Sequence, residues 1–143
     1  MSHRPPFKFS AWTRVGFSDT DAQGIVYYGR YFPYFDVARV EYFRHLHLLY
    51  ADFEGDLVLR ALNIEYHAPA RFDDLLEVFI RVERIGRTSM TFEAQAHRVD
   101  DDLFLAEAHQ TVVHVDLEER KACPIPDEIR AGIREFEGDD VAL

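Results

Sequence analysis

The spacing of apolar residues changes along this chain, and each spacing predicts a different element. Between positions 30 and 47 the apolar residues recur every three or four positions and are mostly aromatic: Tyr31, Phe35, Ala38, Tyr42 and Leu46. Residues at this spacing share one face of an α-helix, so Arg30 to His47 is predicted to be a long helix. Because that face is so aromatic, we expect it to pack against a sheet.

Strands are predicted on both sides of this helix. Phe7 to Phe17, before it, is rich in aromatic and β-branched residues, and Leu57 to His67 and Leu103 to Leu117 follow it. Strict alternation with polar residues predicts two more strands, whose apolar members are Leu76, Val78, Ile80 and Val82, then Met90, Phe92, Ala94 and Ala96. Gly86 and the three aspartates at 100–102 separate the last strands, which predicts antiparallel hairpins.

The order of these elements predicts an α+β fold. A length of 143 residues fits a single domain, 1–143, with its own core. A strand, a long helix and four further strands describe a five-stranded antiparallel sheet with the helix buried on one face. A short acidic helix, about Asp127 to Glu137, is expected after Pro124 and Pro126. A single sheet of this kind has an open edge, so we expect it to pair with a second copy.

Charge and composition limit the kinds of partner and ligand that the protein could bind. Sixteen Lys and Arg against 26 Asp and Glu give a formal net charge of −10, which disfavours nucleic acid and anionic membranes. A ligand that carries phosphate must therefore meet a local basic patch. Cys123 is the only cysteine, so an intrachain disulfide and a clustered zinc site are excluded. With no long apolar run and no apolar stretch behind the initial charges, we expect a cytoplasmic protein.

The change from strand to helix spacing falls within D-T-D-A-Q-G-I-V-Y-Y-G-R-Y, residues Asp19 to Tyr31. Its opening matches a calcium-binding EF-hand loop, with Asp19, Asp21 and Gly24 at the expected positions. The match fails at the twelfth position, where a bidentate Glu is needed and Arg30 stands. A strand, not a helix, also precedes the loop, so we expect no metal.

An aspartate at this place can also cap the helix or close a turn. That role suits Asp19 better than Asp21, which lies several residues before the helix beside the apolar run 25–28. We expect the Asp21 carboxylate to be partly desolvated, which would raise its pKa and basicity. The N–H groups near Tyr28 and Gly29 lack intrahelical acceptors and could receive an oxyanion. A carboxylate beside such donors is the smallest set of groups needed to hydrolyse an activated acyl group.

A family resemblance extends this interpretation. The segment T-D-A-Q-G-I-V-Y-Y-G-R-Y-F and the aromatic helix resemble the signature of the 4-hydroxybenzoyl-CoA thioesterase family of hotdog-fold proteins, including its YbgC-like acyl-CoA thioesterases. The order of elements and I-E-Y-H-A-P-A-R-F-D-D-L-L-E-V, Ile64 to Val78, also match, so the resemblance spans nearly the whole chain. It implies a five-stranded sheet wrapped around one long central helix, with a short C-terminal helix. It also implies hydrolysis of an acyl-CoA to a free acid and coenzyme A without a cofactor.

The resemblance assigns roles by position. Asp21 matches the catalytic carboxylate, a nucleophile or general base, and Tyr28 matches the residue whose backbone N–H polarises the thioester carbonyl. Gly24 matches the signature glycine and is grouped with the substrate-binding residues. The coenzyme A nucleotide lies at a subunit interface in this family, and Arg87 and Ser89 are the implied phosphate contacts. The resemblance further implies a homo-oligomer, a dimer at least and a tetramer of two such dimers.

Some positions leave alternatives open. Arg30 stands where relatives usually have Asn, and Pro33 lies within the first helical turn. Arg30 could place a cation beside Asp21, lowering its pKa and favouring a nucleophile, or it could point to solvent. The Arg84 to Ser89 segment also fits a solvated hairpin end. His67 could face the site from the sheet, although an isolated strand histidine is more often structural.

Two other functions compete with hydrolysis. A hotdog dehydratase acting on hydroxyacyl thioesters relies on a His with an acidic partner, and no His lies in the segment that enters the helix. A non-catalytic acyl-CoA or lipid-binding module would use the same groove without turnover, but it has no need for Asp21. A ligand-sensing repressor would require a DNA-binding helix pair, which the sequence lacks. Aromatic, short branched and long straight acyl groups would all suit an aromatic-lined groove.

Overall fold

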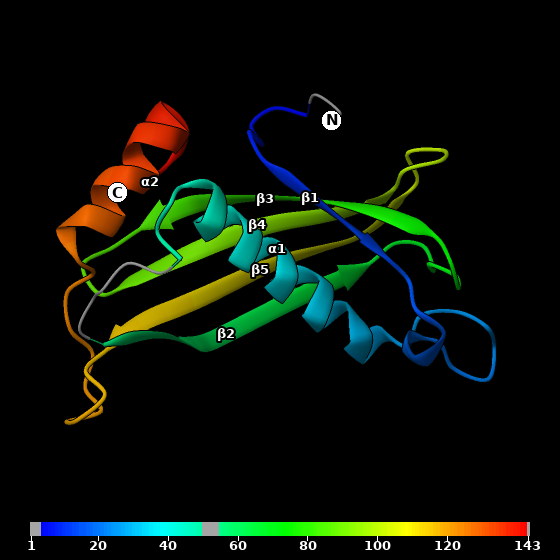
Figure 1. The fold of residues 1–143 in the computed structure, drawn as a ribbon, viewed down its shortest axis with the longest axis horizontal. Coiled ribbons are helices and arrows are strands. Elements are labelled where there is room, and N and C mark those ends of the chain that lie inside the picture. Colours follow the sequence, from blue (N-terminus) through cyan, green and yellow to red (C-terminus); the bar gives the residue numbers. More distant parts are fainter. Residues whose placement is uncertain (1–3, 50–54, 143) are drawn as a thin grey trace.

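A computed structural model describes residues 4–49 and 55–142 as one antiparallel sheet with a long helix lying across it (Figure 1). The strand order in the sheet is β1-β3-β4-β5-β2, and each neighbouring pair is antiparallel. The strands are β1 (Ser10–Arg14), β2 (Asp56–Tyr66), β3 (Leu75–Ile85), β4 (Ser89–Arg98) and β5 (Phe104–Val115). The helices are α1 (Tyr31–His45) and α2 (Asp127–Glu137). The predicted sheet, its two hairpins and both helices are confirmed.

The central helix buries the face that its aromatic spacing predicted. Tyr31, Phe35, Ala38 and Tyr42 are almost fully buried, whereas Leu46 is only partly so. The Tyr42 ring meets Phe92 of β4 edge to face, with ring centroids 5.8 Å apart. Aromatic edges packed on a sheet bury large apolar areas, which holds α1 firmly against β3, β4 and β5. The turn Tyr28–Arg30 leads directly into the helix.

The first strand is shorter than predicted. Pairing with β3 covers Ser10–Arg14, whereas the aromatic pattern indicated Phe7 to Phe17. Pro5 and Pro6 have no N–H to donate to a ladder, so the chain before the strand turns away from the sheet. It crosses the face opposite α1, where Phe7 packs on Phe79 with centroids 5.9 Å apart. Gly16 and a short 3₁₀ turn end the strand at the other side.

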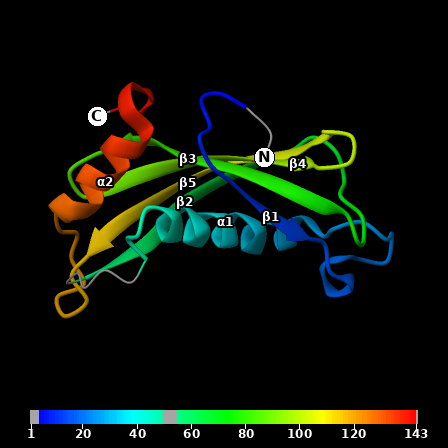
Figure 2. The ribbon, with the colours of Figure 1, turned by 45° about the horizontal axis from the view of Figure 1, so that its top comes forward.

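One edge of the molecule stays open in the single chain. Strand β2 lies at the edge of the sheet and pairs only with β5 among the described residues. Figure 2 shows α1 on one side of the sheet, with α2 at one end of it. Strand β2 and helix α1 both expose large apolar residues: Phe32, Val37, Val40, Val58, Leu59 and Tyr66. Such a surface favours association.

No helix within residues 4–49 and 55–142 is long and apolar enough to cross a membrane.

Candidate active site

The loop between β1 and α1 folds back on itself as a small hairpin. Thr20 and Val26 form a bridge across it, and the Asp21 N–H donates to the Ile25 carbonyl at 2.9 Å. The Gly24 N–H donates to the Asp21 carbonyl at 3.0 Å, and Gly24 has φ of +78°. Residues other than glycine rarely adopt this left-handed conformation. Gly24 therefore sets the turn that carries Asp21.

The side chain of Asp21 takes part in this turn and faces solvent. Its Oδ1 accepts a hydrogen bond of 2.8 Å from the Gln23 N–H, and the residue is exposed. The expectation that the apolar run would desolvate Asp21 is therefore wrong for the single chain. In that run only Val26 is buried, while Tyr27 and Tyr28 point outward. The second carboxylate oxygen has no partner among the described residues, so it is available to a ligand.

Asp19 joins the loop to the helix. Its Oδ2 accepts hydrogen bonds from the Gly16 N–H at 3.0 Å and from the Tyr34 hydroxyl at 2.8 Å. Of the two roles expected for Asp19, closing a turn is confirmed, because its carboxylate accepts the N–H of Gly16 at the start of the 3₁₀ turn. Capping of the long helix is wrong, because the N-cap of α1 is Arg30 and no side chain caps it. Burial and the neighbouring Asp19 carboxylate raise the pKa of Tyr34 well above its usual range. Arg30 Nε lies 3.8 Å from Asp19 Oδ1 and so contacts Asp19, not Asp21.

The backbone around Tyr28 presents a donor at the start of the helix. Among the described residues, no group accepts a hydrogen bond from the Tyr28 N–H. The other end of the same peptide unit is fixed, because the Tyr27 carbonyl accepts the Arg30 N–H at 2.8 Å. The Tyr66 hydroxyl of β2 donates to the Tyr28 carbonyl at 2.9 Å. This contact was missed from the sequence, although Tyr66 lies within Ile64 to Val78, the second segment that carries the family resemblance.

Arg87 and Ser89 lie far from this loop in the single chain. They occupy the β3–β4 hairpin, and the Arg87 carbonyl accepts the Ile125 N–H at 2.9 Å. Strand β3 begins beside the end of β1, near the loop, and runs for 11 residues to the hairpin. A strand of that length spans roughly 35 Å. One chain alone therefore does not bring Arg87 and Ser89 to Asp21.

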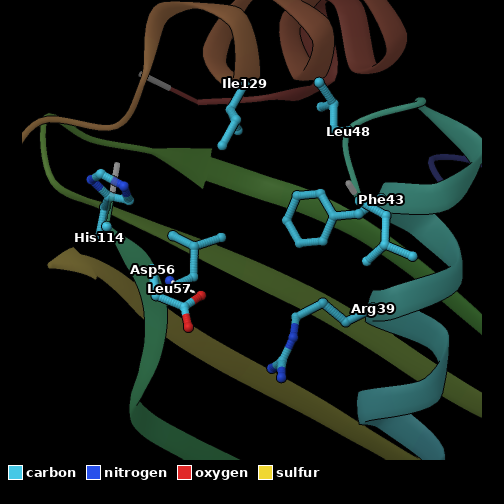
Figure 3. A pocket seen from close by; sticks show the side chains of 9 residues that line it. Arg39, Phe43, Leu48, Asp56, Leu57, His114 and Ile129 are labelled. Carbon is cyan, nitrogen blue, oxygen red and sulfur yellow. Dashed lines mark hydrogen bonds between the residues drawn. The ribbon is translucent and has the colours of Figure 1, made fainter. Parts of the chain in front are cut away.

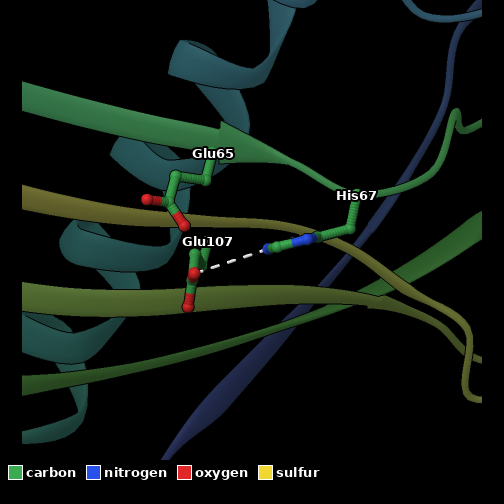
Figure 4. Close-up of side chains that lie close together, drawn as sticks. All are labelled: Glu65, His67 and Glu107. Atoms are coloured by element: carbon green, nitrogen blue, oxygen red, sulfur yellow. Dashed lines mark hydrogen bonds and ion pairs between the residues drawn. The ribbon is translucent and has the colours of Figure 1, made fainter.

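His67 belongs to the face of the sheet that points away from α1. Its ring stacks on Phe104 at 4.4 Å between centroids, and its Nε2 lies 3.4 Å from Glu107 Oε1. Glu65 completes a cluster whose ligand atoms lie within 4.8 Å of one another (Figure 4). Tyr66, the last residue of β2 and the neighbour of His67 in sequence, packs on Tyr28 at the start of α1, with ring centroids 6.0 Å apart. His67 is thus separated from the Asp21 loop by the sheet.

Solved structures share this arrangement of sheet and helix. A hypothetical protein from Aquifex aeolicus superposes with a TM-score of 0.79 at 32% identity, covering 87% of this chain and 98% of that one. A thioesterase from Thermus thermophilus, complexed with coenzyme A and zinc, superposes with a TM-score of 0.80 at 27% identity, covering 94% and 98%. The five-stranded antiparallel sheet around one long helix is accordingly a hotdog fold of the thioesterase class.

Sequence comparison agrees with the fold. Residues 15–133 match the family described as the thioesterase-like superfamily. The acyl-CoA thioester hydrolase YbgC of Escherichia coli O6:H1 is 34% identical over 125 residues, 85% of this chain and 92% of that protein. The acyl-CoA thioesterase YbgC of Haemophilus influenzae is 36% identical over 127 residues, 86% and 92%. The chain belongs to the thioesterase-like superfamily, as a relative of the YbgC thioesterases.

Proposed function

We propose that this protein hydrolyses the thioester bond of an acyl-CoA, releasing a free acid and coenzyme A. The observation that carries the proposal is the loop from Asp19 to Tyr28, which holds an exposed carboxylate and, at the start of α1, a backbone N–H that has no acceptor within residues 4–49 and 55–142. Membership of the thioesterase-like superfamily supports the reaction class. No metal or other cofactor enters the proposed reaction.

In the proposed reaction the thioester carbonyl oxygen accepts a hydrogen bond from the Tyr28 N–H. Charge that develops on this oxygen would be stabilised by the N–H and by the positive end of the helix dipole. Asp21 then either attacks the carbonyl carbon or removes a proton from an attacking water. The carbon–sulfur bond breaks, and the thiolate of coenzyme A takes up a proton. In the nucleophilic route, water hydrolyses the resulting acyl anhydride and restores Asp21.

The coenzyme A phosphates are proposed to meet Arg87 and Ser89 of a second copy. In one chain these residues lie at the opposite end of the sheet from Asp21. If two β2 edges pair antiparallel, the Tyr66 end of one strand lies beside the Asp56 end of the other. The hairpin with Arg87 is at the Asp56 end, since the His114 N–H donates to the Thr88 carbonyl at 2.8 Å and Leu57 pairs with His114. We therefore propose a homodimer at least, and a tetramer built from two dimers.

The alternative functions gain less support. His67 lies across the sheet from the Asp21 loop, so it does not supply the histidine that a dehydratase needs. A binding-only module would leave the geometry of Asp21 and the Tyr28 N–H without a purpose. Hydrolysis uses both.

The test is release of free thiol from a panel of acyl-CoAs by the wild type and by Asp21→Asn. Asn keeps the size of the side chain and can still accept the Gln23 N–H, so the variant should fold normally. We expect kcat to fall about 10²- to 10⁴-fold, the range typical of losing a base or nucleophile. Asp100→Asn, in an exposed turn at 100–101, is the matched control and should retain full activity. Full activity of Asp21→Asn on the best substrate would refute the role of Asp21.

A further inference from the structure

Arg130, on α2, holds the turn that joins β3 to β4. Its Nη2 donates to the Gly86 carbonyl at 2.8 Å and to the Arg87 carbonyl at 3.2 Å. The Ile125 N–H, just before α2, donates to the same Arg87 carbonyl at 2.9 Å. Hydrogen bonds from a charged donor are stronger than those between neutral groups. The backbone of the turn is therefore tied to the C-terminal helix.

The chain that follows β5 ties the same turn to the sheet. The His114 N–H, near the end of β5, donates to the Thr88 carbonyl at 2.8 Å, and the His114 carbonyl accepts the Cys123 N–H at 2.9 Å. The side chains of these two residues also meet, with His114 Nδ1 3.1 Å from Cys123 Sγ. Every carbonyl of the turn 86–88 thus accepts a hydrogen bond from outside the hairpin.

Helix α2 has a fixed position from which Arg130 can act. Ile129 and Ile133 are only 6% and 0% exposed, so this face of the helix is packed against the rest of the chain. Figure 3 shows Ile129 of α2, His114 of β5 and Arg39 of α1 around one pocket at this end of the sheet. Burial of large apolar side chains stabilises the docked helix. Arg130 therefore reaches the turn from a rigid support.

The positive charges around the turn are not neutralised by ion pairs. Arg84 and Arg87 are exposed, and within residues 4–49 and 55–142 neither they nor Arg130 forms an ion pair. Asp127 and Glu128, which begin α2, are exposed and do not pair with Arg130 either. In a chain with a formal net charge of −10, this group of arginines is a local basic patch that suits phosphate.

We propose that Arg130 is a positioning residue for the phosphates of coenzyme A. It fixes the backbone of Gly86 and Arg87, from which the Arg87 side chain meets the phosphates, and it adds its charge to those of Arg84 and Arg87. This inference rests on the proposed acyl-CoA hydrolysis and deepens it. The phosphates and the thioester lie at opposite ends of an acyl-CoA, so Arg130 acts on substrate binding and not on the step that breaks the thioester.

The first test measures binding of adenosine 3′,5′-bisphosphate, which reproduces the nucleotide end of coenzyme A, to the full-length protein by calorimetry. Arg130→Met keeps the length of the side chain without its charge and donors, and should weaken binding about tenfold. Arg134→Met removes the same charge from an exposed position on the same helix and should change binding less than about twofold. No saturable binding to the wild type, unchanged affinity of Arg130→Met, or equal losses in the two variants would each overturn the proposal.

The second test compares hydrolysis of the best acyl-CoA with that of the N-acetylcysteamine thioester of the same acid, which has no phosphates. Arg130→Met should raise KM for the acyl-CoA about tenfold with kcat unchanged, and should leave kcat/KM for the short thioester unchanged. A general loss of structure would lower both activities equally, and that result would overturn the role of Arg130. Asp21→Asn should lower both. If the wild type hydrolyses neither thioester, the proposed function fails, whereas nucleotide binding still decides the role of Arg130.

Discussion

The two ends of α1 hold their polar groups in opposite ways. At the N-terminal end, Asp21 is exposed and bonded within its own loop, and the Tyr28 N–H stands open. At the C-terminal end the polar groups are buried: Glu137 is 0% exposed, and its carboxylate accepts the Tyr42 hydroxyl at 2.6 Å. At the N-terminal end, polar groups that could bind a ligand are exposed to solvent. At the C-terminal end, the Glu137 carboxylate is buried and its hydrogen bonds contribute to the stability of the fold.

This difference predicts opposite responses to substitution. At the N-terminal end, replacing a polar group should change activity with little change in the free energy of unfolding. At the C-terminal end the same kind of replacement should mainly lower the free energy of unfolding. It would leave buried donors or acceptors without a hydrogen-bond partner, and water cannot replace that partner.

The largest expected effect tests whether the open end is completed by a second copy. Asp21→Asn homodimers should be nearly inactive, and Arg87→Glu homodimers should bind acyl-CoA poorly because the phosphates would meet a negative charge. When the two variants are mixed and refolded together, half of the mixed dimers' sites contain wild-type Asp21 and wild-type Arg87. Thiol release from acyl-CoA should then rise to about a quarter of the wild-type rate, by random association. Activity that does not rise on mixing would place Asp21 and Arg87 in the same chain's site or in no common site.

The next effect concerns the buried carboxyl at the closed end. Glu137 also accepts the Val82 N–H at 3.0 Å, so Glu137→Ala would leave two buried donors without an acceptor. The free energy of unfolding should fall by roughly 2–5 kcal/mol, measured by urea unfolding. Glu128→Ala, an exposed position on the same helix, should change it little. Similar losses from both substitutions would contradict the comparison.

The same carboxyl predicts a pH dependence. Burial raises the pKa of Glu137 above its ordinary value of 4.5, so the native state holds this proton more tightly than the unfolded chain does. The resulting stabilisation is full below about pH 4.5 and is lost as pH rises through the higher native pKa. Glu137→Gln cannot ionise, so its stability relative to the wild type should increase with rising pH. Urea unfolding of both proteins across this range measures the difference, and a constant difference would contradict the raised pKa.

A smaller effect is expected at the turn that carries Asp21. Gly24 has φ of +78°, and a Cβ there would meet nothing within 4 Å, so Gly24→Ala tests backbone strain alone. We expect a loss of about 1–2 kcal/mol in local stability and a lower kcat, since the turn positions Asp21. Gly24→Asn should cost less, because Asn tolerates the left-handed conformation. If Ala and Asn behave alike, the turn does not depend on this conformation.

The smallest effect is expected where the loop meets the helix. Tyr34→Phe removes the hydroxyl that donates to Asp19 and should cost about 1 kcal/mol of unfolding free energy. Because Asp19 also accepts the Gly16 N–H, the loop should keep its fold and kcat should fall only severalfold. Amide exchange of residues 19–28, compared between the wild type and the variant, reports whether the loop has loosened. Unchanged exchange would mean that the Gly16 N–H and Arg30 are enough to hold Asp19.

Much of the fold follows from the sequence because its signals are local. The spacing of Tyr31, Phe35 and Tyr42 predicts α1, and strict alternation predicts β3 and β4, so these elements are confirmed nearly to the residue. The first strand was predicted too long because aromatic and β-branched content does not show where pairing with β3 stops: it covers only Ser10–Arg14, before Gly16 and the 3₁₀ turn. The directions in which side chains point were predicted less well than the elements. Arg30 pairs with Asp19 because both flank the same turn, a contact that spacing along the chain does not reveal.

The two ends of α1 also differ in how far the sequence could reveal them. Asp21, Gly24 and Tyr28 fall within one short segment, so a motif can mark that end. At the other end, Arg39 of α1 and His114 of β5 line the same pocket although they lie far apart in the sequence. The Cys123 partner of His114 lies on the chain that follows β5. No contiguous pattern in the sequence marks this pocket.

The donor at Tyr28 has one further consequence, for how the chain can change over time. The N–H belongs to the backbone and is oriented by the Tyr27 carbonyl, which Arg30 holds from the other side. Almost any side chain at position 28 keeps this group, and only Tyr28→Pro removes it. Mutation and selection can therefore reshape the surface at position 28, where the exposed ring of Tyr28 stacks on Tyr27, without altering the donor.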